Sequence, residues 1–252
     1  MAISGIAGSI AGRGIWEAGR HAFSAAAHWR YAQLFGSDAT SGKLHLVVGA
    51  LVPPACQDQA GNPFPFIFSK PGLLNAGFST SVAIPSCEVR AAKYLAESVA
   101  VNARRLAILP TDVDIADKGD LSFVSFGIMS NLKTVQLLEN SGNHFARYHE
   151  GQFITKLSGR VLARASQQTD YGLIVKVHPS NLPDKTWICC GGFGEWGTSG
   201  AAWYLSRKWR NIRSKFTRHP FIIIVKVRLG SDESAEPILM ADTPEEVERH
   251  II

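Results

Sequence analysis

The spacing of apolar residues predicts that helices and short strands alternate along most of the chain. Apolar residues at three- and four-residue steps indicate amphipathic helices over residues 15–35 and 85–104. Short β-branched and aromatic runs indicate strands at 43–51, 106–109, 121–126, 187–190 and 221–227. This alternation predicts an α/β fold with a mainly parallel, doubly wound (Rossmann-like) sheet.

Two further runs, at 152–165 and 171–177, have polar turns beside them and predict a small antiparallel extension that covers part of the sheet. A Pro-, Gly- and Ser-rich stretch of about thirty residues follows Pro53 and Pro54 and is typical of a long loop holding one short edge strand. We expect two units: an N-terminal helical segment at 1–36 and a single α/β ligand-binding domain at 37–252.

The first twelve residues carry no charge, and Ile3, Ile6 and Ile10 fall on one face of a helix. They lack the basic start of a secretory signal and are too short to span a bilayer. We therefore expect either a frayed or docked terminus, or a segment that contacts another copy of the chain or a membrane surface. Contact with another copy would make the protein a homo-oligomer.

Two strand-to-helix turns carry the candidate chemistry. In the first, the strand at 121–126 runs through Gly127 into Ser130 and Asn131, where a capped helix begins. In the second, Gly192, Gly194 and Gly197 satisfy G-x-G-x-x-G between a strand and a helix that we expect to begin near Thr198. Free N–H groups and the positive end of the helix dipole favour an anion at such a helix start.

These turns predict a site for a phosphate-bearing small molecule, with a nucleotide or an NAD(P)-like compound as the possible ligand or cofactor. The ligand-binding candidates are the glycines, hydroxyls and amide of the two turns: Gly127, Ser130, Asn131, Gly192, Gly194, Gly197, Thr198 and Ser199. The alternatives are plain helix caps and glycines that only permit close packing. No acid follows the glycine motif at the distance of about 20 residues expected for an ordinary NAD site.

The paired turns resemble those of uncharacterised bacterial α/β domains and of some prokaryotic surface-layer proteins. The resemblance covers residues 120–208 and is carried by Gly127, Ser130, Asn131 and Thr134 in the first turn, and by Gly197, Thr198, Ala201 and Ala202 in the second. It implies a fold rather than an activity. A surface-layer role would require a signal peptide, and the first residues do not have that pattern.

Three function classes remain open from the sequence. The first is a sensor or effector module that binds a nucleotide-like ligand. The second is an enzyme on a nucleotide or NAD-type substrate, similar to a glycohydrolase, with Glu195 as the catalytic carboxylate and Asn131 or Ser199 as an orienting group. The third is a structural or assembly protein.

The charge balance limits the classes of binding partner that we expect. The chain has 26 Lys and Arg against 21 Asp and Glu, and seven of these acids lie at 232–249. The part before residue 232 is therefore basic, which favours an anionic partner. Nucleic acid is possible but not favoured, because no standard nucleic-acid-binding motif accompanies the six basic residues at 207–218.

The four cysteines form no C-x-x-C pair, and adjacent Cys189 and Cys190 lie in an apolar run. We expect buried, reduced thiols and a cytoplasmic protein. The acidic stretch with Asp112, Asp114, Asp117 and Asp120 does not fit the EF-hand pattern. We therefore expect a solvated loop there and no metal site.

Overall fold

The structure is a computed structural model of the whole chain. It describes residues 27–51, 82–150, 152–163, 166 and 168–249, together with four short strands between residues 56 and 79. The predictions for residues 1–12, and for the first part of the helix at 15–35, lie outside the described residues.

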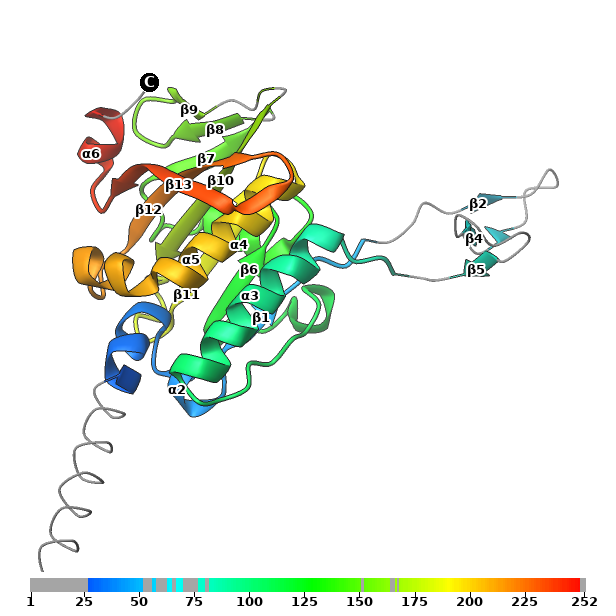
Figure 1. Cartoon of the computed structure of the whole chain (residues 1–252), viewed down its shortest axis with the longest axis horizontal. Coiled ribbons are helices and arrows are strands. Elements are labelled where there is room, and N and C mark those ends of the chain that lie inside the picture. Colours follow the sequence, from blue (N-terminus) through cyan, green and yellow to red (C-terminus); the bar gives the residue numbers. More distant parts are fainter. Residues whose placement is uncertain are drawn as a thin grey trace, which may run out of the picture.

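A six-stranded sheet forms the centre of the molecule, with the strand order β1-β6-β11-β10-β12-β13 (Figure 1). Its strands are β1 (His45–Val47), β6 (Phe123–Phe126), β10 (Thr169–Val177), β11 (Trp187–Gly192), β12 (Phe221–Arg228) and β13 (Ser231–Ala241). Every residue of β6, and all of β11 except Gly192, is buried, as expected for strands covered on both faces. The α/β class predicted from the sequence is confirmed.

The sheet is mixed, so the prediction of a mainly parallel sheet is wrong. Only the pairs β1–β6 and β6–β11 are parallel, whereas β11–β10, β10–β12 and β12–β13 are antiparallel. The physical reason lies in the connections. Residues 178–186 between β10 and β11, and two residues between β12 and β13, are short links without a crossover helix, and such links join antiparallel neighbours.

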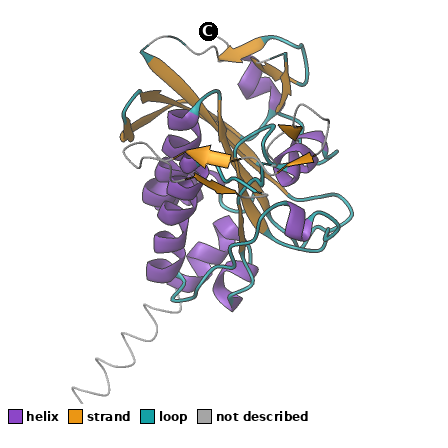
Figure 2. Ribbon diagram, turned by 90° about the vertical axis from the view of Figure 1, so that its right-hand side faces the viewer, coloured by secondary structure: helices purple, strands orange, loops and turns teal. Residues whose placement is uncertain are grey.

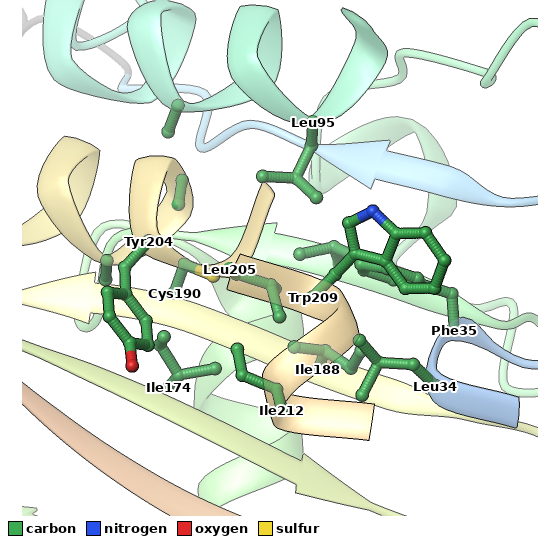
Figure 3. Packing of buried hydrophobic residues seen from close by; sticks show 14 of the residues in the cluster. Leu34, Phe35, Leu95, Ile174, Ile188, Cys190, Tyr204, Leu205, Trp209 and Ile212 are labelled. Carbon is green, nitrogen blue, oxygen red and sulfur yellow. The ribbon is translucent and has the colours of Figure 1, made fainter. Parts of the chain in front are cut away.

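Two long helices and the helix at residues 27–35 cover one face of the sheet. The long helices are α3 (Ser86–Asn102), close to its predicted range, and α5 (Glu195–Phe216). Leu95 from α3, and Leu205 and Trp209 from α5, pack with Phe35 on Ile188 of the sheet (Figure 3). Residues from 27 onward in the N-terminal segment are therefore part of the same core as the sheet.

The opposite face is covered by smaller elements (Figure 2). They are α4 (Leu132–Glu139), α6 (Pro244–Arg249) and a three-stranded antiparallel sheet of β7 (Ala146–His149), β8 (Gln152–Thr155) and β9 (Val161–Ala163). This small sheet is the antiparallel extension predicted from residues 152–165. The second predicted part, at 171–177, instead lies in the main sheet as part of β10.

The remaining elements are short. The helix α2 (Asp38–Ser41) precedes β1, and the 3-10 helix η1 (Val113–Ile115) precedes β6. The stretch predicted to hold one edge strand contains two separate two-stranded sheets, made of β2 (Cys56–Gln57), β3 (Pro63–Phe64), β4 (Ile67–Ser69) and β5 (Gly77–Ser79). The strand predicted at 106–109 is reduced to an isolated parallel bridge between Ile108 and His45.

Candidate functional site

The two glycine-bearing turns lie next to each other at one end of the main sheet. Phe126 pairs with Cys190 at the carboxyl ends of β6 and β11, and Gly127 N–H donates to the carbonyl of Cys190 at 3.1 Å. Both helices begin at this end, but α4 packs on one face of the sheet and α5 on the other. The two turns that the sequence singled out therefore share one end of one sheet.

The side chain of Asn131, in the first turn, hydrogen-bonds the backbone of the protein. It is fully buried as the N-cap of α4, where its side chain accepts from Lys133 N–H at 3.0 Å and donates to the carbonyl of Val47 at 2.9 Å. Gly127 has a φ of 79°, which explains why glycine is needed there. Because the Asn131 amide is fully buried and bonded to the backbone, it fits a cap rather than an orienting residue.

Two buried carboxylates hold the first turn to the end of β1. Glu88 of α3 accepts from Gly49 N–H at 2.5 Å and from Ser130 Oγ at 2.7 Å. Asp112 accepts from Ala50 N–H and from Leu132 N–H, both at 2.8 Å. The expectation that the acidic stretch is solvated is therefore wrong for Asp112, which is 2% exposed.

Burial raises the pKa of Glu88, and the nearby charge of Asp112 acts in the same direction against the hydrogen bonds from Gly49 and Ser130. Glu88 was not among the residues singled out from the sequence. It lies at an ordinary position in the first turn of a long helix, and only the tertiary fold brings it to the turn. No group of three or more His, Cys, Asp or Glu able to hold a metal ion occurs within the described residues.

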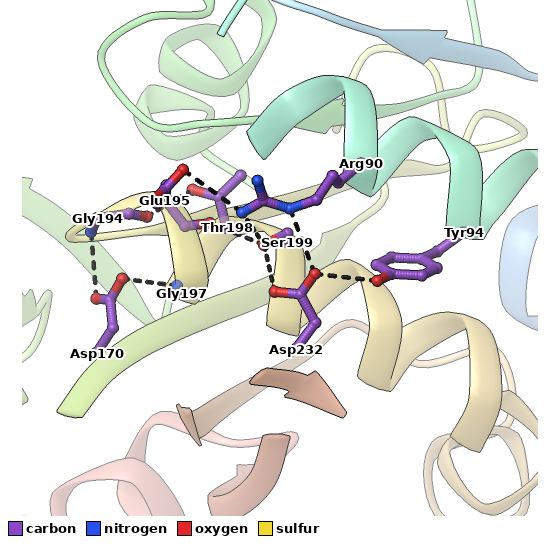
Figure 4. Close-up of polar contacts among 9 residues, drawn as sticks. All are labelled: Arg90, Tyr94, Asp170, Gly194, Glu195, Gly197, Thr198, Ser199 and Asp232. Carbon is purple, nitrogen blue, oxygen red and sulfur yellow. Dashed lines mark hydrogen bonds and ion pairs between the residues drawn. The ribbon is translucent and has the colours of Figure 1, made fainter. Parts of the chain in front are cut away.

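The start of α5 is already occupied by a carboxylate of the chain itself. The helix begins at Glu195, one turn earlier than expected, so Gly197 lies inside its first turn. Asp170 of β10 accepts from Gly194 N–H at 3.2 Å with Oδ1 and from Gly197 N–H at 2.7 Å with Oδ2 (Figure 4). A phosphate could not use these two amides without displacing Asp170.

The other candidates in the second turn also face protein atoms. A Cβ at Gly192 would overlap backbone atoms of Gly197 and Thr198, and one at Gly197 would overlap the carbonyl of Tyr171. Thr198 is 3% exposed, and its hydroxyl donates to the carbonyl of Gly194 at 3.3 Å. The hydroxyl of Ser199 lies 2.5 Å from Asp232 Oδ1 and is fully buried. Close packing therefore accounts for Gly192 and Gly197.

A cluster around Arg90 lies beside this helix start (Figure 4). The guanidinium of Arg90 lies 3.5 Å from both Glu195 Oε2 and Asp232 Oδ2, and it donates to Ser199 Oγ at 3.2 Å. It also stacks over the Trp196 ring, 4.6 Å from the ring centroid. Arg90 and Glu88 are two residues apart in α3, so one helix start contacts both glycine-bearing turns.

Tyr94 completes the cluster by donating to Asp232 Oδ2 at 3.0 Å. Burial, followed by the hydrogen bond and charge of Asp232, raises the pKa of Tyr94 to about 12. Asp232 and Arg90 were not found from the sequence, where Asp232 was counted only in the acidic C-terminal stretch. No sequence pattern joins residues 90 and 94 of α3 with residue 170 of β10 and residue 232 of β13, because the three elements are far apart along the chain.

The end of the sheet is more acidic than the sequence suggested. Five carboxylates lie there, from Glu88, Asp112, Asp170, Glu195 and Asp232, and Arg90 is the cation that contacts two of them. Glu195 is half-exposed, whereas the other four are buried. Such an arrangement can accept hydrogen bonds from hydroxyl or amino groups, and it offers an anion one guanidinium.

The cysteine prediction is confirmed, since Cys189 and Cys190 are buried, free thiols in β11. Burial raises the pKa of Cys189 to about 12 and that of Cys190 well above its usual value, so neither is a thiolate nucleophile.

Comparisons of the chain with protein-family models, with curated proteins and with solved structures found no match. No helix among the described residues has the length and apolar character needed to cross a bilayer.

Proposed function

We propose that this chain is a domain that binds a small nucleotide-like ligand, as a sensor or effector module, at the carboxyl ends of β6 and β11. One observation carries the proposal. Two adjacent parallel strands end in glycine-bearing turns whose helices pass to opposite faces of the sheet. In open α/β sheets, ligands bind in the crevice outside the strand ends at such a point.

The charges at this end favour a ligand that carries both hydroxyl groups and an anion, which is the chemistry of a nucleotide. The exposed carboxylate of Glu195 is placed to accept from ribose hydroxyls, while Arg90 is placed to contact a phosphate. The amides of Glu195 and Trp196 are also in the first turn of α5 and have no acceptor among the described residues. In this proposal the phosphate contacts Arg90 and these amides rather than Gly194, Gly197 or Thr198.

A thermal-shift screen over NAD, NADP, ATP and cyclic nucleotides tests the proposal. A ligand present at 100 times its dissociation constant stabilises the folded protein by about 2.7 kcal/mol, which is readily detected. Calorimetry on Arg90→Lys and Arg90→Gln should then show affinity falling by roughly tenfold or more, since a hydrogen bond to a charged group is lost or weakened.

Arg207→Gln is the matched control, because Arg207 makes an exposed ion pair with Glu97 at 3.6 Å on the outer surface of α5. The affinity of Arg207→Gln for the ligand should equal that of the wild type. The proposed site is wrong if no compound in the screen raises the melting temperature. It is also wrong if Arg207→Gln loses as much affinity as Arg90→Gln. The structural or assembly alternative, in which the glycines serve packing alone, would then be preferred.

A second candidate is an enzyme that cleaves a nucleotide or NAD-type substrate, and the exposure of Glu195 beside Arg90 favours it. The Glu195 side chain is 49% exposed at the end of the sheet, where it could stabilise a ribosyl cation or act as a base. Asn131 and Ser199 are both buried and hydrogen-bonded within the protein, so Glu195 would act without them. Release of nicotinamide from NAD by the wild type but not by Glu195→Gln would support this candidate.

Self-association through residues 1–12 is part of the proposal and rests on their uncharged, isoleucine-bearing sequence. Removing these residues should lower the mass measured by light scattering or reduce binding to liposomes. If neither measurement changes, the segment is a docked terminus.

A further inference from the structure

A pocket of about 360 Å³ opens between α4 and β7, on the face of the sheet opposite to Arg90. Four apolar or aromatic residues line it, namely Met129, Val135, Leu138 and Tyr148. Its other lining residues are titratable, namely Glu139, Arg147, His149 and Lys156. A cavity of this size that combines apolar side chains with convergent charged groups fits a small molecule that has both characters.

The two cations of the pocket have few internal partners. Arg147 is exposed, and its guanidinium forms no hydrogen bond or ion pair with any described residue. Lys156 donates to the carbonyl of Asn143 at 2.8 Å and to that of Asn140 at 3.5 Å, both just beyond the end of α4. These bonds fix the position of the ammonium group and leave one of its three N–H groups for a ligand.

Arg147 and Lys156 are close enough to repel each other. Burial is the main cause that lowers the pKa of Lys156, and the charge of Arg147 adds to it, while Glu139 acts in the opposite direction. A bound anion would relieve this repulsion and give the Arg147 guanidinium a partner that matches its fork of N–H donors.

We propose that this pocket binds a small anionic molecule with an apolar or aromatic body, whose carboxylate or phosphate group contacts Arg147 and Lys156. The body of the molecule packs against Val135, Leu138 and Tyr148. Met129 of the first turn also lines this pocket, but its anion contacts are separate from those of the nucleotide-like site, since Arg90 and Arg147 lie on opposite faces of the sheet.

Three probes of similar size test the proposal by titration of the full-length protein, followed by amide chemical shifts. Benzoate and phenyl phosphate supply the two anionic groups, and benzyl alcohol is their neutral counterpart. We expect saturable shifts in α4 and β7 with at least one anion, and binding of benzyl alcohol that is at least about tenfold weaker. The tighter of the two anions identifies the group that the natural ligand carries.

Matched arginine variants locate the binding. Arg147→Gln should weaken binding of the anion about tenfold or more, whereas Arg160→Gln, an equal change of charge at an exposed residue outside the pocket lining, should leave it unchanged. Arg90→Gln should also bind the anion as the wild type does, which separates this site from the nucleotide-like site. Absence of binding by both anions, equal binding of benzyl alcohol, or equal losses in the Arg147 and Arg160 variants would overturn the proposal.

Discussion

At the scale of single residues, side chains of the chain itself accept hydrogen bonds from the backbone N–H groups at two helix starts. Asp170 accepts from two amides at the start of α5, and Asn131 and Asp112 do the same for α4. A carboxylate at a helix start has the charge and geometry of a bound phosphate. A glycine-rich turn read from sequence therefore cannot distinguish a ligand site from an internal cap, because Asp170 lies 24 residues before Gly194.

Replacing Asp170 should measure this cap directly. Asp170→Ala should lower the free energy of unfolding by about 1–3 kcal/mol, because it removes an acceptor from the buried amide of Gly197 and a negative charge from the helix start. Asp170→Asn, which keeps one acceptor, should cost less. Urea denaturation of the two variants is the measurement.

Asp114→Ala is a suitable control for this experiment, because Asp114 is exposed and bonds only Thr111 within its own turn. The free energy of unfolding of Asp114→Ala should stay within about 0.5 kcal/mol of the wild-type value. A loss in Asp170→Ala no larger than in Asp114→Ala would contradict the assignment of Asp170 as the cap.

The raised pKa of Glu88 predicts a dependence of stability on pH. Because its folded-state pKa lies above the unfolded value of about 4.3, its contribution to stability is complete below that pH and is lost as the pH rises through the folded-state pKa. Glu88→Gln imitates the protonated acid and does not titrate. The free energy of unfolding of the wild type minus that of Glu88→Gln should therefore fall with rising pH, by at most about 1.4 kcal/mol per pH unit.

Chemical denaturation of both proteins from pH 4 to pH 8 gives this difference, and the titration of all other groups cancels in it. A difference that increases with pH would mean that the hydrogen bonds from Gly49 and Ser130 outweigh burial and hold Glu88 ionised.

At the scale of elements, the sequence predicted the segments whose pattern is local. The helix α3 and the strands β6 and β11 lie close to their predicted ranges, since each has a continuous apolar face or run. The strand β13 was missed, because its acids and Pro237 interrupt the alternation and its burial is irregular. The place of β10 in the main sheet was also missed, since partner strands are chosen by the whole fold and not by the pattern of one segment.

The junction between β11 and α5 gives a prediction at this scale. Gly192→Ala should reduce the free energy of unfolding by about 1–3 kcal/mol, because the added Cβ would overlap backbone atoms of Gly197 and Thr198, which cannot rotate away. Thermal or urea unfolding measures the loss.

Gly119→Ala provides the comparison, since a Cβ there meets no atom within 4 Å and its backbone has no positive φ. It should change stability by no more than about 0.5 kcal/mol. Equal stability of the two alanine variants would mean that the first turn of α5 can shift, and that packing does not explain Gly192.

At the scale of the whole molecule, the candidate site combines segments that are far apart in the sequence. The turns at 127–131 and 192–197 were found because their glycines and polar residues are consecutive. Glu88, Arg90 and Asp232, which connect these turns or neutralise charge there, were not found. No local pattern marks a charged residue that becomes buried or partly buried only in the folded chain. Burial of charge is a property of the tertiary structure.

Lys176 links three such distant segments and gives the last prediction. Its buried ammonium, in the central strand β10, donates to the carbonyl of Gln33 at 3.2 Å and to that of Arg218 at 3.1 Å. It thereby joins the helix at 27–35 to the end of α5. Burial, with a smaller effect of the Arg218 charge, lowers the pKa of Lys176 to about 7.

The unfolded chain binds this proton up to about pH 10.4, whereas the folded chain releases it near pH 7, so the stability of the wild type should increase between these values. The free energy of unfolding relative to the uncharged Lys176→Met should rise by a few kcal/mol from pH 7 to pH 10, at up to about 1.4 kcal/mol per unit. Denaturant titrations of both proteins across this range measure it. A difference independent of pH would show that the two carbonyls stabilise the ammonium enough to offset burial, and that Lys176 holds the three segments together as a permanent cation.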